Sequence, residues 1–186
     1  MTKIKNICVY CGASNRVSDI YLQAADDVGR LLAENGIGLI YGGGRLGLMG
    51  KVADSVLAGG GRAVGIIPQH LQDREERHDE LSELHIVDTM HVRKQMMTER
   101  SDAFLILPGG YGTMEEAFEI LTWKQLGLHN KPILFLNIRD FWNPLKELKQ
   151  HLFDESFIKD DDLKLFGIVD NLDQILPEIE TQLAAV

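Results

Sequence analysis

The sequence predicts an α/β fold in which a doubly wound parallel sheet carries helices on both faces. Short apolar runs alternate with longer helical segments, and this βαβα order is typical of parallel sheets. The apolar runs show no alternation between polar and apolar residues, so the strands should be buried on both faces. A chain of 186 residues, 45% of them hydrophobic, can fill one core and is short for two. We therefore expect a single Rossmann-like domain over residues 1–186.

The predicted elements follow one another along the chain. Residues 5–10 should form the first strand and residues 19–35 the first helix, which Gly36 ends. Further strands are predicted at 38–41, 63–68, 84–88, 103–108 and 132–137, and further helices at about 48–58, at 90–101 and after a turn at 108–113. Residues 141–153 and 171–183 should close the domain as amphipathic helices.

The charge of the chain limits its partners. Nineteen basic and 28 acidic side chains give a net charge of −9, and a field of that sign repels a nucleic-acid backbone. A small phosphorylated ligand remains compatible with it, because backbone amides and one or two arginines act at short range. The N-terminus shows no signal sequence and no apolar run is long enough to span a bilayer, so we expect a cytoplasmic protein without a membrane partner.

Neither the cysteines nor the histidines form a metal-binding pattern. Cys8 and Cys11 stand at the end of the first strand without a second pair, and the six histidines lack spacings such as H-E-x-x-H. No G-x-S-x-G elbow indicates a serine hydrolase. We therefore predict no metal site and no redox role for the thiols.

The first glycine loop is GGGRLG, residues 42–47, which matches the G-x-G-x-x-G pattern of dinucleotide sites between a strand and a helix. A nicotinamide site also needs an acid at the tip of the next strand to hold the ribose, but that strand ends in Pro68. An NAD oxidoreductase is therefore disfavoured. Two interpretations stay open: a tight turn with close helix packing, or phosphate and ribose contacts from Gly43 and Gly44.

The second glycine turn belongs to PGGYGTMEE, residues 108–116. Its three glycines lack the Cβ atoms that would keep backbone amides apart, and Thr113 adds a hydroxyl at the expected helix start, which suits a phosphate. Thr113 and Glu116 also fit a capping box, in which each only satisfies the other's backbone donor. The doublet Glu115 and Glu116 favours chemistry, because carboxylates beside a phosphate are costly unless one stabilises a ribosyl cation or orients water.

The segment MHVRKQMMTERS, residues 90–101, supplies the basic counterpart. Arg93 and Lys94 lie in the first turn of the predicted helix, where a cation opposes the helix dipole, so an anion from outside explains them best. Ordinary surface charges are the alternative. The methionines of this helix should be mostly core residues, and Arg100 should be solvated.

Together these residues resemble the LOG ("Lonely guy") family of cytokinin riboside 5′-monophosphate phosphoribohydrolases, whose members are often mislabelled as lysine decarboxylases. The resemblance covers nearly the whole chain, through YGGGRLGLMG at 41–50, MHVRK at 90–94, and PGGYGTMEE followed by LTWKQLG. It implies hydrolysis of the N-glycosidic bond of AMP or an N6-modified AMP by a homodimer without metal or organic cofactor. The lysine decarboxylase label has no chemical support, since no lysine lies in a setting suited to pyridoxal phosphate.

The resemblance also assigns roles to residues. Arg93 and Glu116 match the catalytic pair of the family. The substrate-binding positions match Glu75, Arg93, Lys94, Gly110, Tyr111, Gly112, Thr113, Met114, Glu115, Glu116 and Thr122. After Glu75 the segment ERHDELSELHIV departs from the GETVGEV pattern of the family. The acidic run at 73–80 has two interpretations, a solvated loop or a lid on the ligand side of the sheet.

We therefore expect the amides of residues 110–113 to bind the 5′-phosphate, Glu116 to assist ribosyl-cation formation and water attack, and Arg93 to orient the substrate and Glu116. The alternative is a non-catalytic nucleotide or molybdenum-cofactor carrier, which needs the phosphate turn but no acid beside the ribose. The base stays open between N6-prenylated adenine, adenine and another purine.

The apolar segment FEILTWKQLGL, residues 118–128, gives a second reason to expect a homodimer. Phe118, Leu121 and Leu126 can face the sheet while Trp123 points elsewhere. An apolar side chain left on the outer face would then be available to a second copy of the chain.

Overall fold

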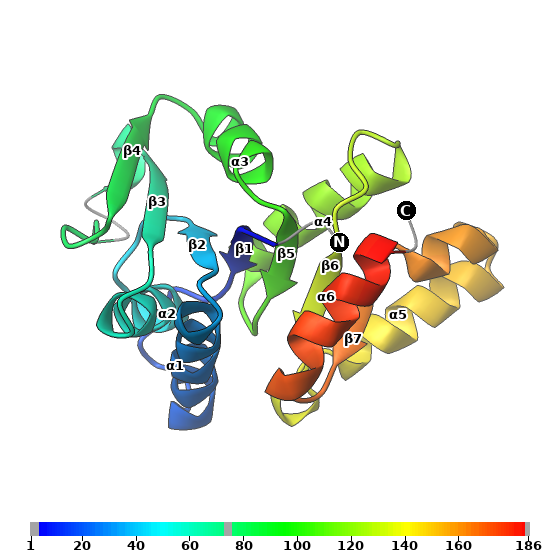
Figure 1. Ribbon diagram of the computed structural model, residues 1–186. Coiled ribbons are helices and arrows are strands. Elements are labelled where there is room, and N and C mark those ends of the chain that lie inside the picture. Colours follow the sequence, from blue (N-terminus) through cyan, green and yellow to red (C-terminus); the bar gives the residue numbers. More distant parts are fainter. Residues whose placement is uncertain (1–3, 73–75, 185–186) are drawn as a thin grey trace.

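The computed structural model describes residues 4–72 and 76–184. Its strands form one seven-stranded sheet (Figure 1): β1 Asn6–Tyr10, β2 Gly38–Tyr41, β3 Ala63–Pro68, β4 Glu83–Val87, β5 Ala103–Ile106, β6 Ile133–Leu136 and β7 Gly167–Val169. The α-helices are α1 Asp19–Glu34, α2 Gly47–Ala58, α3 Met90–Glu99, α4 Tyr111–Gln125, α5 Asn143–Asp154 and α6 Ile175–Ala184. The predicted α/β fold with a doubly wound, Rossmann-like sheet is confirmed.

The order of the strands locates the ligand side of the sheet. All pairings are parallel, in the order β4-β3-β2-β1-β5-β6-β7. The chain builds outward from β1 to β4, returns to β5 on the other side of β1, and continues to β7. Ligands of open α/β sheets bind beyond the carboxyl ends of the strands at such a reversal. The turn at 108–113 directly follows β5 and therefore lies at this switch point.

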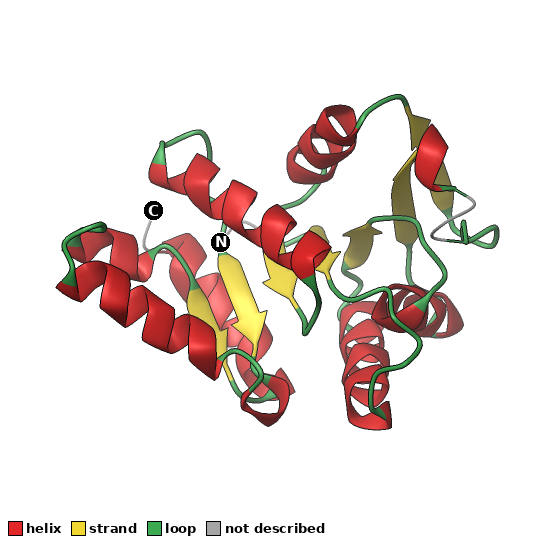
Figure 2. Ribbon diagram, turned by 180° about the vertical axis from the view of Figure 1, so that it is seen from behind, coloured by secondary structure: helices red, strands yellow, loops and turns green. Residues whose placement is uncertain are grey.

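Helices cover both faces of the sheet (Figure 2). On one face α1, α2 and α6 contribute core side chains such as Leu32, Val52 and Ile179. On the other face α3, α4 and α5 contribute Met97, Ile120 and side chains around Leu145. Because α3 and α4 share a face, residues near their N-termini can meet above the ends of the strands.

The strand predictions hold best at the centre of the sheet. β2, β3, β5 and β6 are buried throughout, as their apolar runs predict. In β4 only Val87 is buried and Ile86 is 48% exposed, so the prediction of full burial is wrong for this strand. β4 is an edge strand with one neighbour, which leaves its outer side accessible. Strand β7 was not predicted, because three residues give no readable period.

Some predicted boundaries also differ. The strand predicted at 103–108 ends at Ile106, and the helix predicted at 171–183 begins at Ile175, after a 3₁₀ turn at Leu172–Gln174. The helix predicted at 90–101 ends at Glu99. These shifts are two to four residues, and they leave the order of the elements unchanged.

The outer face of α4 is more apolar than predicted. Leu121 is buried, but Phe118 is 42% and Leu126 is 68% exposed, so the expectation that these two face the sheet is wrong. The buried stripe of α4 follows Thr113, Ala117, Ile120 and Leu121 at helical spacing; Phe118 is one position off it. Leu126 lies beyond the end of the helix.

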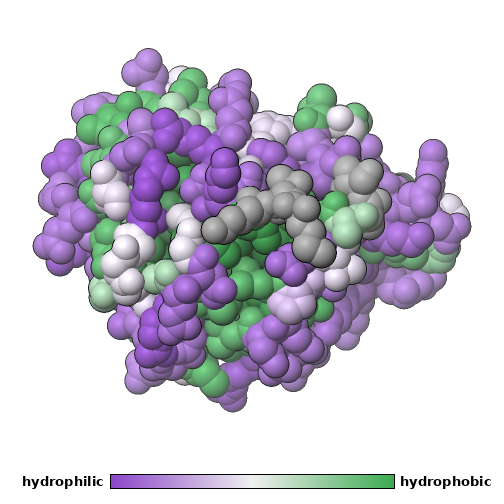
Figure 3. All heavy atoms as spheres, viewed as in Figure 1, coloured by the Kyte–Doolittle hydropathy of each residue, from purple (hydrophilic) through white to green (hydrophobic). Residues whose placement is uncertain are grey.

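Figure 3 shows one face of the molecule, on which hydrophilic side chains predominate and hydrophobic patches lie between them. Within residues 4–72 and 76–184, no helix combines the length and the apolar character that crossing a membrane requires.

Candidate active site

The turn at 108–113 packs tightly against the loop after β1. The N–H of Gly12 donates to the carbonyl of Pro108 at 3.1 Å. A Cβ atom on Gly109 would lie 2.1 Å from Oγ1 of Thr113, so a side chain cannot be accommodated at this position. The turn therefore holds the start of α4 at the switch point between β1 and β5.

Helix α4 begins at Tyr111, two residues before the expected Thr113. Gly110 is its N-cap and, as a glycine, has no side chain that could cap the first turn. Of the two interpretations, the capping box is therefore wrong: Thr113 is buried at the third helical position and is not the N-cap residue. Gly110 and Gly112 are exposed, with open space where a Cβ would stand. Unpaired amides and the positive end of the dipole make such a helix start suitable for an anion.

Arg93 of α3 lies buried between the first glycine loop and α4. Its Nη2 atom donates to the carbonyl of Gly42 at 3.2 Å and lies 4.0 Å from Oε1 of Glu116. This approach requires a glycine, because a Cβ on Gly42 would lie 2.0 Å from Nη2. The interpretation of Arg93 as an ordinary surface charge is wrong, since only 4% of its side chain is exposed. A buried cation needs partners of this kind.

Lys94 has its anionic partners within the chain. Its Nζ atom lies 2.6 Å from Glu115 and 2.9 Å from Glu119. Burial alone would lower the pKa of Lys94, but the hydrogen bonds to both carboxylates outweigh it and raise that pKa. The external anion inferred for Lys94 is thus not needed to explain its position. Sequence reasoning missed Glu119, although its spacing of four residues from Glu115 places both on one side of a helix.

The first glycine loop is engaged by other parts of the chain. The N–H of Gly47 donates to Oδ1 of Asn15 at 2.7 Å, so the start of α2 is capped where that of α4 is open. Gly43 and Gly44 are both buried. Of the two interpretations left open for this loop, these contacts favour the tight turn.

The structure brings together most of the predicted site residues. Tyr111 and Met114 lie on the first turn of α4, and Tyr111 is 89% exposed. Thr122 lies on the same helix, exposed, with its hydroxyl donating to the carbonyl of Phe118 at 2.8 Å. It lies six positions after Glu116, about 9 Å along the helix axis, so the two side chains do not meet within one chain. Glu75 lies outside the described residues.

The thiols beneath the site are kept protonated. Burial raises the pKa of Cys8 and Cys11, and the carboxylate of Glu116 adds to both effects. Burial likewise raises the pKa of Tyr10. Neither Cys8 nor Cys11 is therefore suited to act as a thiolate nucleophile. No group of three or more His, Cys, Asp or Glu side chains in the described part of the chain could hold a metal ion.

Arg100, predicted to be solvated, is partly exposed and pairs with Glu83 at 3.1 Å. This pair lies at the far end of α3 from Arg93, and it connects α3 to the edge strand β4. The basic residues of α3 thus divide between the candidate site and the edge of the sheet.

These features define a Rossmann-like protein with a helix start suited to an anion at the switch point, beside a buried arginine that lies 4.0 Å from a partly buried glutamate. Residues 49–179 match the family described as possible lysine decarboxylase. The chain is 40% identical to the cytokinin riboside 5′-monophosphate phosphoribohydrolase LOG of Oryza sativa subsp. japonica, over 98% of this chain and 78% of the relative. It is 46% identical to a cytokinin riboside 5′-monophosphate phosphoribohydrolase of Rhodococcoides fascians, over 83% of this chain and 78% of the relative. The chain belongs to this LOG family.

Solved structures of lower identity share the fold. The molybdenum-cofactor carrier protein of Chlamydomonas reinhardtii superposes with a TM-score of 0.73 at 18% identity, covering 99% of this chain and 100% of that chain. The molybdenum-cofactor-binding protein of Rippkaea orientalis has a TM-score of 0.69 at 20% identity, covering 97% and 98%. At such identities the likeness shows the fold alone.

Proposed function

We propose that this protein hydrolyses the N-glycosidic bond of an adenine-type nucleoside 5′-monophosphate and releases the free base and ribose 5-phosphate. The observation that carries the proposal is the glycine-rich start of α4 beside the buried Arg93 and the partly buried Glu116, whose Nη2 and Oε1 atoms are 4.0 Å apart. One end of the site suits a phosphate and the other a cationic ribose. The names of relatives at 40% and 46% identity support the same reaction.

The phosphate would bind at the start of α4. The backbone N–H groups of residues 110–113 would donate to its oxygens, and the dipole of this 15-residue helix would favour its charge. The carboxylate of Glu115 does not oppose this binding strongly, because Lys94 pairs with it at 2.6 Å. We assign the chemistry to Glu116, whose Oε1 atom lies 4.0 Å from Nη2 of Arg93.

The reaction breaks the bond between C1′ of the ribose and N9 of the purine. The bonding electrons leave with the base, so positive charge develops on the ribose. The carboxylate of Glu116 would stabilise that charge and orient a water molecule, whose hydroxyl bonds to C1′ while its proton goes to the departing base. Arg93 would hold the carboxylate of Glu116 and the substrate in the relative orientation that the reaction needs.

A carrier of nucleotides or of the molybdenum cofactor is the second candidate, and the shared fold at a TM-score of 0.73 is its support. A carrier needs the anion site at α4 and gains nothing from an acid beside the ribose. The burial of Arg93 next to Glu116 therefore favours the hydrolase.

A panel of nucleoside 5′-monophosphates separates the two functions. Purified protein would be incubated with AMP, N6-prenylated AMP, GMP and CMP, and free base would be detected by chromatography. Release of adenine or N6-prenyladenine supports the hydrolase and identifies the base. Tight nucleotide binding without release of any base would contradict it and favour a carrier.

The proposal includes a homodimer in the cytoplasm. Support for the dimer comes from apolar side chains exposed on α4 and after it, namely Phe118, Leu126 and Leu128. Thr122 and Phe118 also line an apolar groove between α4 and α5, so the apolar surface extends from one helix to the other. Light scattering should give about twice the chain mass of 20.9 kDa. A mass of one chain at micromolar concentration would contradict the dimer.

A further inference from the structure

His78 is a buried histidine outside the residues assigned to the reaction. It lies in the segment 76–80, here named the strap, and is 2% exposed. Its Nε2 atom lies 2.9 Å from Oδ1 of Asp54 on α2, and its Nδ1 atom accepts the N–H of Glu80 at 3.2 Å. With Nδ1 accepting, a neutral ring carries its proton on Nε2 and donates it to Asp54. Both ring nitrogens are therefore used to hold the strap in one place.

The strap in turn pairs with the first glycine loop, residues 42–47. The N–H of Arg45 donates to the carbonyl of Glu76 at 2.8 Å, and the N–H of His78 donates to the carbonyl of Gly43 at 3.0 Å. Between these two bonds Gly44 and Arg77 form an antiparallel bridge. The strap thus pairs with the glycine loop as a short antiparallel β-bridge.

The same loop holds the guanidinium of Arg93. Gly42 is the neighbour of Gly43 in the chain, and its carbonyl accepts from Nη2 of Arg93 at 3.2 Å. His78 is therefore connected to Arg93 through two hydrogen bonds, one from its own N–H to the carbonyl of Gly43 and one from Arg93 to the carbonyl of Gly42. Buried groups held through such bonds resist displacement, because an unsatisfied donor or acceptor in this setting is costly.

We propose that His78, held by Asp54, is a positioning residue: it fixes the strap against the glycine loop and thereby fixes the carbonyl of Gly42 that orients Arg93. The inference depends on the proposed hydrolase function for its kinetic consequence. Its structural part, the tethering of the glycine loop, does not depend on that function.

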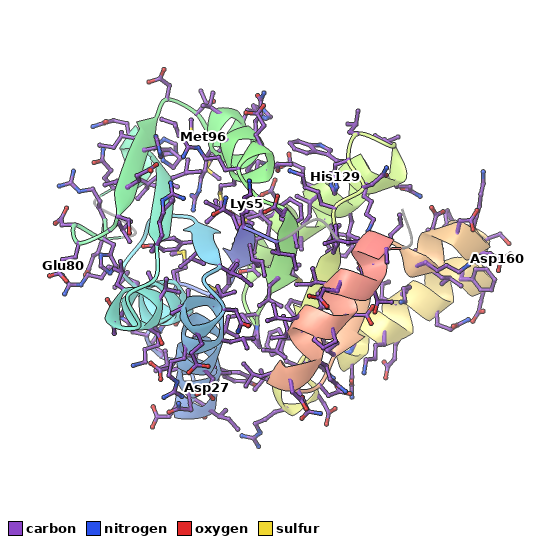
Figure 4. The ribbon with its side chains drawn as sticks, in the orientation of Figure 1. Lys5, Asp27, Glu80, Met96, His129 and Asp160 are labelled. Atoms are coloured by element: carbon purple, nitrogen blue, oxygen red, sulfur yellow. The ribbon has the colours of Figure 1, made fainter. Side chains whose placement is uncertain are left out.

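Asp54 is the better residue to change, because 59% of its side chain is exposed and its loss leaves no cavity. Asp54→Ala removes the acceptor of the His78 proton, whereas Asp54→Asn keeps an amide oxygen at the same place. Asp27→Ala is the matched control: it removes an aspartate of the neighbouring helix α1 whose side-chain partners are Gln23 and Arg30. Figure 4 shows Asp27 on α1, away from Glu80 in the strap.

Two measurements decide the proposal. The first is kcat and KM for AMP in the full chain, and the second is hydrogen exchange of the Arg45 and His78 amides, with the melting temperature as a check on the fold. In Asp54→Ala we expect kcat/KM to fall about three- to tenfold, the factor that one lost hydrogen bond gives, and both amides to exchange faster. Asp54→Asn should restore most of both values, and Asp27→Ala should change neither.

Other outcomes overturn it. If Asp54→Ala lowers the melting temperature but leaves kcat/KM and the two amides as in wild type, His78 is only a packing residue. His78→Gln, which can still reach Asp54, should retain more activity than His78→Leu, and equal losses would also contradict the proposal. A wild-type protein that releases no base refutes the proposed function, and the amide exchange alone then decides whether the strap tethers the loop.

Discussion

Replacing Glu116 with glutamine separates a catalytic carboxylate from a structural one. The substitution removes the charge and preserves the size of the side chain. In the structure this carboxylate faces a cation, the guanidinium of Arg93, at 4.0 Å. Two unit charges at about 4 Å interact with roughly 4 kcal/mol at an effective dielectric constant of about 20. A ribosyl charge that is only partly developed at a similar distance would lose less, about 2.7 kcal/mol, which is a fall in kcat of about 100-fold.

The fold should survive this change. Removing one member of a buried ion pair costs about 3–5 kcal/mol when the other is left without partners. Arg93 keeps the carbonyl of Gly42, and 13% of the Glu116 side chain is exposed, so the loss of stability should lie below that range. A thermal melt followed by circular dichroism measures this cost separately from the kinetics.

The assay is release of adenine from AMP under saturating and limiting substrate. Glu115→Gln is the control, because it removes the same charge one residue away but faces Lys94. It should lower the melting temperature modestly and leave kcat within a few-fold of wild type. A folded Glu116→Gln protein with near-normal kcat would refute the catalytic role and leave α4 as a phosphate site without chemistry.

The remaining predictions concern the phosphate, metals and pH. Nucleosides, diphosphates and triphosphates should be cleaved far more slowly than 5′-monophosphates, because a charge-assisted hydrogen bond contributes about 1.5–3 kcal/mol and the turn at 110–113 suits one terminal phosphate; equal turnover of adenosine and AMP would remove the phosphate site. Activity should persist after treatment with EDTA, since no metal-binding cluster lies among the described residues; activity lost with EDTA and restored by zinc or magnesium would contradict this. Hydrogen bonds from Arg62 and His85 lower the pKa of Glu83 to about 2 from 4.5, so its stabilisation is present above pH 4.5 and is lost as the pH falls toward 2. The difference in melting temperature between wild type and Glu83→Gln should therefore shrink over that range, and a difference constant with pH would show that the charge is not involved.

The fold was predictable because it depends on period and burial. Strands such as β3 and β6 are continuous apolar runs, and only a parallel sheet covered on both faces buries such runs completely. The edges were less predictable, because the run Ile86–Val87 of β4 is as apolar as a core strand, while β4 has a neighbouring strand on one side only. Composition records what a strand can bury, while its position in the sheet decides what is buried.

The candidate site was predictable in its residue types and less so in its contacts. The glycines and acids of 108–116 predict an anion site at a helix start, but the sequence could not show that the helix begins at Tyr111 and leaves Thr113 inside it. A two-residue shift at a helix end is within the usual uncertainty of sequence patterns, and here it decides whether a capping box can form. The contact between Arg93 and the carbonyl of Gly42 was also out of reach, because it joins residues 51 positions apart through a backbone atom.

The doublets Arg93–Lys94 and Glu115–Glu116 can be understood as one arrangement on two neighbouring helices. Lys94 meets Glu115 at 2.6 Å and Arg93 meets Glu116 at 4.0 Å, so a tight pair and a loose pair stand side by side between α3 and α4. The tight pair, with Glu119 as a second partner of Lys94, connects the two helices. In the proposed reaction, Arg93 would orient the Glu116 carboxylate across this 4.0 Å distance, and that carboxylate would stabilise the positive charge that develops on the ribose.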